Sequence, residues 1–169
     1  MRRWLAAYGP GTEADLRWWT GWTAAQVRAA LAAVAAVEVD LGGAPGLLLP
    51  DDLEPVPPAE PWVALLPALD PTVMGWSGRD WYLGEHGPAL FDRSGNAGPT
   101  VWCDGRVVGG WAQLPSGAVA HRLLEDIGEL AIESVEAKAA ELTRRLGAVR
   151  ITPRFRTPLE RALIAGSPG

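Results

Sequence analysis

An acidic, proline-rich segment divides the chain and limits how its residues can fold. Residues 51–61 contain four prolines and four acidic side chains. This composition is typical of an extended linker that forms neither helix nor sheet. We therefore predict a small domain at residues 1–50, a linker at residues 51–61 and a second domain at residues 62–169.

Three short helices are predicted in the first domain. Residues 2–8 carry apolar side chains at helical spacing. Thr12 can cap a second helix that ends near Gly21, and Thr23 with Gln26 forms a capping box at the start of a third, alanine-rich helix. Two helices that meet across a short turn containing glycine are typical of a helix-turn-helix.

A hairpin is predicted directly after the third helix. Residues 37–41 alternate between apolar and polar side chains, residues 42–46 are rich in glycine and proline, and residues 47–49 form an apolar run. Three helices followed by a hairpin are the order of elements in a winged helix, and this is the fold we predict for the first domain.

The second domain is predicted to combine strands with a long helix. The predicted strands are residues 62–66, 81–83, 89–91, 100–103, 106–114, 118–124 and 149–152. Turns at Asp104-Gly105 and Ser116-Gly117 favour a meander. Helical periodicity begins at Ile127, and a last helix is expected at residues 158–163. The predicted fold class is α+β, with a winged helix followed by a mostly antiparallel β-meander or barrel-like domain that carries a long C-terminal helix.

Composition excludes several classes of protein. The net charge of −5 argues against a protein that coats nucleic acid without specificity, because such a protein is basic throughout. Cys103 is the single cysteine, so the chain has neither an intrachain disulfide nor a zinc site built from cysteine pairs. No apolar stretch is long enough to span a membrane or to form a signal peptide, so we predict a cytoplasmic protein.

Catalytic and metal-binding motifs are not found in the sequence. The histidines and aspartates of the second domain lack a recognised ligand spacing, and there is no phosphate-binding glycine loop or nucleophile motif. We expect no metal site, no cofactor and no catalytic residue.

The third predicted helix carries a small set of side chains that could contact DNA. Thr23, Gln26 and Arg28 are its polar residues. Glutamine can pair with adenine and arginine with guanine in the major groove. The alternative is that this helix belongs to a packing scaffold that never enters a groove.

Arginines of the second domain are the candidates for phosphate contacts. The densest basic run lies between Arg144 and Arg161, and strand alternation would place Arg150, Arg154 and Arg156 on one side. Other arginines lie beside aromatic residues on predicted loops. The alternative is a solvated charged face or turn caps. The predicted phosphate contacts are Arg79, Arg93, Arg106, Arg154 and Arg156.

Several blocks of sequence resemble a known family. The blocks are residues 8–10, 14–16, 18–22, 65–76, 79–83, 91–102 and 105–111. Together they resemble the winged helix DNA-binding domain proteins related to the AlkZ-like DNA glycosylases. The resemblance implies tandem winged helices and a barrel-like part that cup double-stranded DNA. In the glycosylase members it also implies removal of alkylated or crosslinked bases.

Two departures from the family limit what the resemblance implies. Members of the family are longer, and this chain resembles their C-terminal half, either as a natural short form or as a truncated product. Their catalytic Gln-x-Gln or Gln-x-Asp pair lies in the N-terminal half. Here only Gln26 and Gln113 exist, followed two positions later by Arg28 and Pro115, so we expect a protein without base excision.

Three hypotheses about function remain open from the sequence. The first is a DNA-binding module whose partner is double-stranded DNA. The second is a structural or interaction module that needs a missing N-terminal half, in the same chain or as a protein partner. The third is a repair glycosylase that works through other residues.

Overall fold

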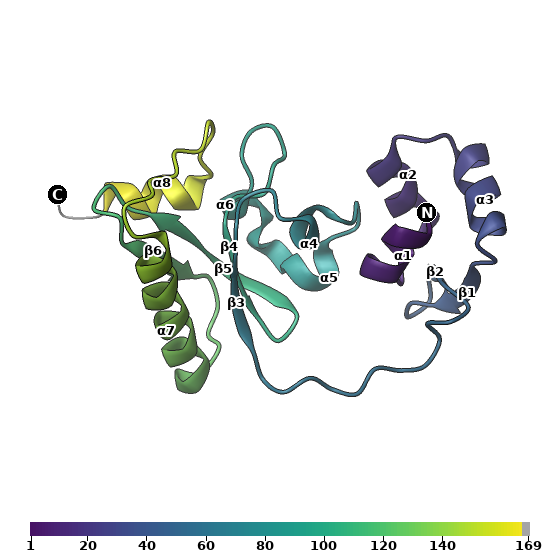
Figure 1. Cartoon of the computed structure of the whole chain (residues 1–169), viewed down its shortest axis with the longest axis horizontal. Helices are drawn as coiled ribbons and strands as arrows, with labels where there is room; N and C mark the ends of the chain where they lie inside the picture. The colour runs from purple at the N-terminus through teal and green to yellow at the C-terminus, as the bar shows by residue number, and fades with distance from the viewer. Residues whose placement is uncertain (167–169) are drawn as a thin grey trace. The chain divides into compact units, whose positions relative to one another are not determined.

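The computed structural model describes residues 1–166 and divides the chain into two compact units (Figure 1). The first unit comprises Met1–Pro58 and Pro71–Gly78, and the second comprises Ala59–Asp70 and the residues from Arg79 onward. The boundaries predicted from sequence placed residues 71–78 in the second domain, whereas the structure groups them with the first unit. The reason is packing, because Val73 and Trp76 are buried and the ring of Trp76 contacts those of Trp4 and Tyr8.

The first unit contains three helices and a hairpin in the order that the sequence indicated. The elements are α1 (Arg2–Tyr8), α2 (Glu13–Thr20), α3 (Ala24–Ala33), β1 (Val37–Asp40), β2 (Pro45–Leu48) and the short α4 (Pro71–Met74). The predicted capping box forms between Thr23 and Gln26, and the predicted cap at Thr12 is part of a second capping box with Asp15. Gly21 ends α2 with φ of 68°, a conformation in which glycine has no Cβ penalty.

A buried carboxylate joins α2 to residues 77 and 78. Asp15 is only 4% exposed. One of its oxygens accepts hydrogen bonds from the backbone and hydroxyl of Thr12, and the other accepts from Ser77 N, Ser77 Oγ and Gly78 N. Burial by itself would raise the pKa of Asp15, but the hydrogen bonds donated by Thr12, Gly78 and Ser77 outweigh it and hold the pKa below its ordinary value. The side chain therefore stays ionised inside the unit.

The second unit is built on one antiparallel sheet. Its strands are β3 (Val63–Leu66), β4 (Thr100–Cys103), β5 (Arg106–Gln113) and β6 (Val119–Leu123), in the order β3-β4-β5-β6. Its helices are α5 (Asp80–Leu83), the 3₁₀ turn η1 (Gly84–His86), α6 (Gly87–Leu90), α7 (Glu129–Leu146) and α8 (Pro158–Ala165). The predicted α+β class and the long C-terminal helix are confirmed.

Helices cover both faces of this sheet. On one face, α7 packs against a cluster that includes Val101, Val108 and Val135. On the other face, Tyr82 of α5 stacks on Trp102 with ring centroids 5.4 Å apart, and α8 packs against β5 and β6. Almost every residue of β5 is therefore buried, as expected for a strand that is covered on both sides.

Three predicted strands are wrong. Residues 81–83 and 89–91 lie in or beside the short helices α5 and α6, because an apolar run of three residues carries no period that separates helix from strand. Residues 149–152 have no regular structure. Their backbone is held by the side chain of Gln113, which donates to Val149 O and accepts from Ile151 N, both at 2.9 Å.

Within residues 1–166, no helix has the length and apolar character needed to cross a membrane.

Candidate nucleic-acid interface

A groove in the second unit gathers arginines from two loops and one helix. It has a volume of about 710 Å³ and lies between the loop after α6 and the segment that leads into α8. Four arginines line it, together with two phenylalanine rings and a single carboxylate. Its charged and aromatic lining residues are Phe91, Asp92, Arg93, Arg154, Phe155, Arg156 and Arg161. We call this the arginine groove.

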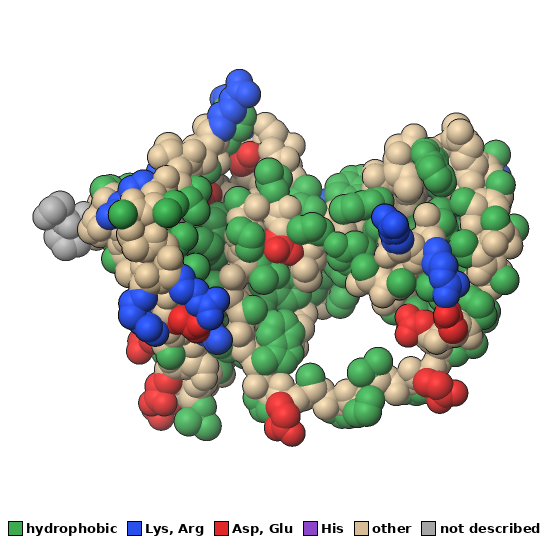
Figure 2. Space-filling view, viewed as in Figure 1, with side chains coloured by type: hydrophobic (Ala, Val, Ile, Leu, Met, Phe, Trp, Pro, Cys, Tyr) green, Lys and Arg blue, Asp and Glu red, His purple; other side chains and the backbone are tan. Residues whose placement is uncertain are grey.

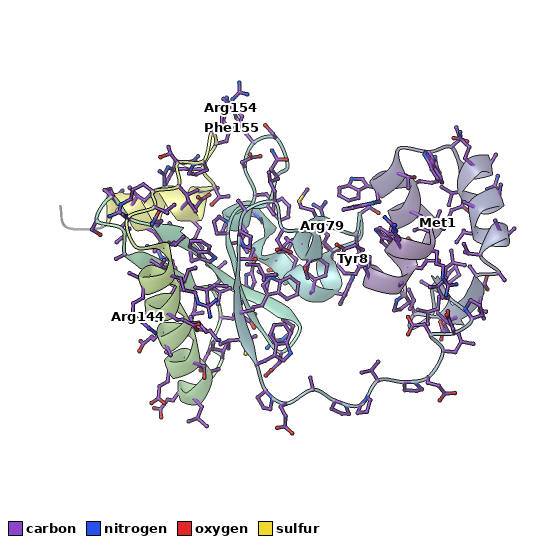
Figure 3. The ribbon with its side chains drawn as sticks, viewed as in Figure 1. Met1, Tyr8, Arg79, Arg144, Arg154 and Phe155 are labelled. Carbon is purple, nitrogen blue, oxygen red and sulfur yellow. The ribbon has the colours of Figure 1, made fainter. Side chains whose placement is uncertain are left out.

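Phe155 is the central ring of the arginine groove. The guanidinium carbon of Arg93 lies 5.0 Å from the centroid of this ring, and that of Arg154 lies 5.4 Å from it. Figure 3 shows Arg154 and Phe155 projecting from the end of the loop that precedes α8, and Figure 2 shows basic side chains at this place. Contacts of this kind orient a guanidinium without using its N–H donors, so the donors remain free to bind an anion.

The only carboxylate of the groove is occupied by its own loop. Asp92 Oδ1 accepts from the backbone of Ser94 at 2.7 Å and of Asn96 at 3.0 Å. These bonds, that of Asn96 first, lower the pKa of Asp92. Gly95 completes the turn with φ of 80°, in the left-handed region that favours glycine. Asp92 therefore shapes the loop that presents Arg93. The charge of Arg93 also lowers the pKa of Asp92, but within residues 1–166 no ion pair joins Asp92 to a groove arginine.

The predicted row of Arg150, Arg154 and Arg156 is wrong for Arg150. The guanidinium of Arg150 donates to the carbonyls of Ser116 at 2.9 Å and of Gly147 at 2.8 Å, so it ties the chain to a turn of the sheet. Arg154 and Arg156 reach the groove because the chain is irregular here. The prediction of a common surface for these two arginines rested on a strand that does not form.

Two other predicted phosphate contacts lie outside the groove lining. The guanidinium of Arg79 stacks on Phe91, 5.1 Å from the ring centroid, and Phe91 lines the groove. Arg106 instead pairs with Glu125 at 2.6 Å, and Glu125 also contacts His86 Nε2 at 3.0 Å. Arg79 therefore neighbours the groove, and Arg106 forms a separate ion pair.

The helix α3 of the first unit has one buried side and one side exposed to solvent. Val27 and Leu31 are its buried residues, and Gln26 and Arg28 are exposed. Gln26 Oε1 accepts from Thr23 N and Thr23 Oγ1, both at 2.9 Å, and Arg28 pairs with Glu13 at 3.2 Å. A glutamine reads adenine with both its oxygen and its nitrogen, so Gln26 would have to leave the capping box to do so.

Some groove residues were missed by sequence reasoning. Phe155 lies between two arginines in the sequence, and the Arg-Phe-Arg triplet was a signal for an aromatic contact. Arg161 was visible as part of the basic run, but its position one turn into α8 depends on the packing of that helix. Its Nη1 donates to Arg156 O at 2.6 Å, a contact that holds the rim of the groove together.

Both glutamines of the chain have structural roles. Gln26 completes the capping box of α3. Gln113 is 9% exposed and binds the backbone of Val149 and Ile151. Both side chains are therefore engaged in hydrogen bonds that hold the fold.

Fold and groove together define a small α+β protein with a basic, aromatic-lined groove. The sequence model of the DNA glycosylase AlkZ-like family matches residues 1–145. The chain therefore belongs to the AlkZ-like DNA glycosylase family.

A solved structure supports the same assignment. The DNA glycosylase AlkZ of Streptomyces sahachiroi superposes with a TM-score of 0.72 and 26% sequence identity. The superposition covers 90% of this chain and 43% of AlkZ, so the chain spans less than half the length of that protein. A comparison with curated proteins found no match.

Proposed function

We propose that this chain is a DNA-binding module of the AlkZ-like family. The observation that carries the proposal is the arginine groove, in which Arg93, Arg154 and Arg156 lie close together and form no ion pair with a carboxylate of residues 1–166. Several arginines elsewhere are instead paired with carboxylates, as Arg2 is with Asp51 and Arg28 with Glu13. Unpaired guanidiniums in a groove are the groups that bind phosphate diesters.

The proposal assigns different roles to the two units. In the second unit the groove arginines and the neighbouring Arg79 bind backbone phosphates, while Arg106 can join them only by leaving Glu125. In the first unit the helix, turn, helix and hairpin form a winged helix whose α3 faces DNA through Thr23, Gln26 and Arg28. Phosphate contacts supply most of the affinity and base contacts the specificity, so we expect the groove to dominate binding.

Base excision is not part of the proposed function. AlkZ is a DNA glycosylase by name, but its activity belongs to a protein of which this chain matches less than half. The two glutamines of this chain serve a helix cap and a buried backbone contact. We infer that the chain binds DNA, alone or together with further AlkZ-like sequence, and that the cytoplasm is its place of action.

The salt dependence of binding tests the proposal. We expect duplex DNA, titrated in fluorescence anisotropy, to bind with a plot of log affinity against log salt whose slope is about −3 or steeper, because about 0.9 of a counterion is released per phosphate neutralised. The net charge of −5 opposes general attraction to DNA, so a steep slope requires a local basic site. No binding at about 50 mM salt would remove the proposal.

A further inference from the structure

The arginine groove has the volume of a pocket for a small ligand. Its volume is about 710 Å³, within the range of pockets that enclose a small ligand. The major groove of DNA alone is about 12 Å wide, so a whole double helix can touch the rim of this groove but cannot enter it. One or two nucleotides of a single strand can.

The lining of the groove alternates rings with cations. Phe155 is 39% exposed and carries guanidiniums from Arg93 on one loop and Arg154 beside it. Positively charged grooves that contain exposed aromatic rings are the common solution for binding single-stranded nucleic acid, because every base has a face that can stack. A duplex, whose bases are already stacked, gains nothing from such a ring.

The groove also keeps its positive charge. Asp92, its one carboxylate, accepts hydrogen bonds from the backbone of Ser94 and Asn96 and from the amide of Asn96. No described side-chain carboxylate forms an ion pair with Arg93, Arg154 or Arg156 within residues 1–166. The guanidiniums are therefore available to phosphates on either side of a base.

We propose that the arginine groove binds an unpaired segment of single-stranded DNA, in which a base replaces a guanidinium on the ring of Phe155 and the flanking phosphates are held by Arg93, Arg154 and Arg156. This inference rests on the proposed function, since it assumes that these arginines bind phosphates. It adds that the groove prefers DNA with unpaired nucleotides to a duplex. It assigns this preference to Phe155.

The test compares two substitutions of Phe155 on two forms of DNA. The ligands are a labelled oligothymidine of about 12 nucleotides, within the usual site size of such grooves, and a blunt duplex. Phe155→Leu keeps apolar volume and loses the aromatic face, whereas Phe155→Trp keeps a face for stacking. Phe155 is partly exposed, so neither change is expected to affect folding, and near-ultraviolet circular dichroism checks this.

We expect Phe155→Leu to weaken oligothymidine binding about 10-fold, as the loss of one stacked base predicts, and to leave duplex binding within about 3-fold, since the arginine charges that bind its phosphates remain. Phe155→Trp should retain the affinity for oligothymidine. Leu130→Ala, which removes another exposed apolar side chain, is the matched control and should change neither.

The outcomes separate this inference from the proposed function. Equal losses of single-strand and duplex affinity in Phe155→Leu would show that Phe155 only positions the arginines, and would overturn the inference while duplex binding stands. Unchanged affinities in Phe155→Leu would overturn it as well. Tighter binding of oligouridine RNA than of oligothymidine would overturn the choice of DNA, and failure to bind either DNA would remove both proposals.

Discussion

Replacing Arg93, Arg154 and Arg156 together by alanine is expected to lower the affinity for duplex DNA by about 100-fold at about 50 mM salt. Each side chain contributes a guanidinium that lacks a carboxylate partner and can bind one phosphate. Loss of three such contacts should also reduce the magnitude of the log–log salt slope by about 2.7. Fluorescence anisotropy with one labelled duplex across a salt series measures both quantities.

A charge-matched control is available on the same unit. Arg122, Arg144 and Arg145 are exposed and do not line the arginine groove, so their replacement by alanine removes the same net charge elsewhere. We expect this variant to bind with nearly the wild-type slope. If both triple variants lose the same affinity and slope, DNA responds to overall charge, and the groove has no special role.

The second large effect concerns stability of the first unit. Asp15→Asn is expected to destabilise it by about 3 kcal/mol, because a buried amide nitrogen would face backbone donors where a carboxylate oxygen now accepts. For a unit of this size the melting temperature should fall by roughly 10 °C or more. Thermal unfolding followed by tryptophan fluorescence measures the change. Asp51→Ala, which removes an exposed carboxylate paired with Arg2, should cost less than about 1 kcal/mol.

The effect of Asp15 should depend on pH in one direction. The folded-state pKa lies below the ordinary value of 3.8, so ionised Asp15 contributes its stability above that value and loses it as the pH falls through the folded pKa. The difference in stability between wild type and Asp15→Asn should therefore be full at pH 7 and shrink in acid. A difference in stability that stays constant down to about pH 2 would contradict the claim that ionised Asp15 stabilises the first unit through these hydrogen bonds.

The local structure of the first unit could be predicted because its signals are local. Thr12 and Thr23 each lie three residues before a side chain that completes a capping box, and Gly21 marks the end of α2. The role of Asp15 could be predicted only in part. Its bond to Thr12 follows from spacing, but its bonds to Ser77 and Gly78 join residues more than 60 positions apart, and no local pattern indicates them.

The sequence could predict which arginines are candidates for phosphate contacts, but it could not predict that they lie together in one groove. Arg93, Arg154 and Arg156 stood out as arginines beside aromatic residues or in a basic run. Their common location depends on the packing of α6 against α8, which is a tertiary contact. The predicted strand at residues 149–152 shows the same limit, since the buried amide of Gln113 replaces the strand pairing that the sequence favoured.

The most direct measurement of the central claim follows arginine side chains by nuclear magnetic resonance. The chain has fourteen arginines, whose Nε–Hε signals can be assigned by single substitutions and observed during titration with duplex DNA. We predict that the signals of Arg93, Arg154 and Arg156 shift first and most, while those of Arg2 and Arg145, which lie in exposed ion pairs, remain in place. Shifts confined to arginines outside the groove, or none at saturating DNA, would contradict the claim that this groove is where the protein meets DNA.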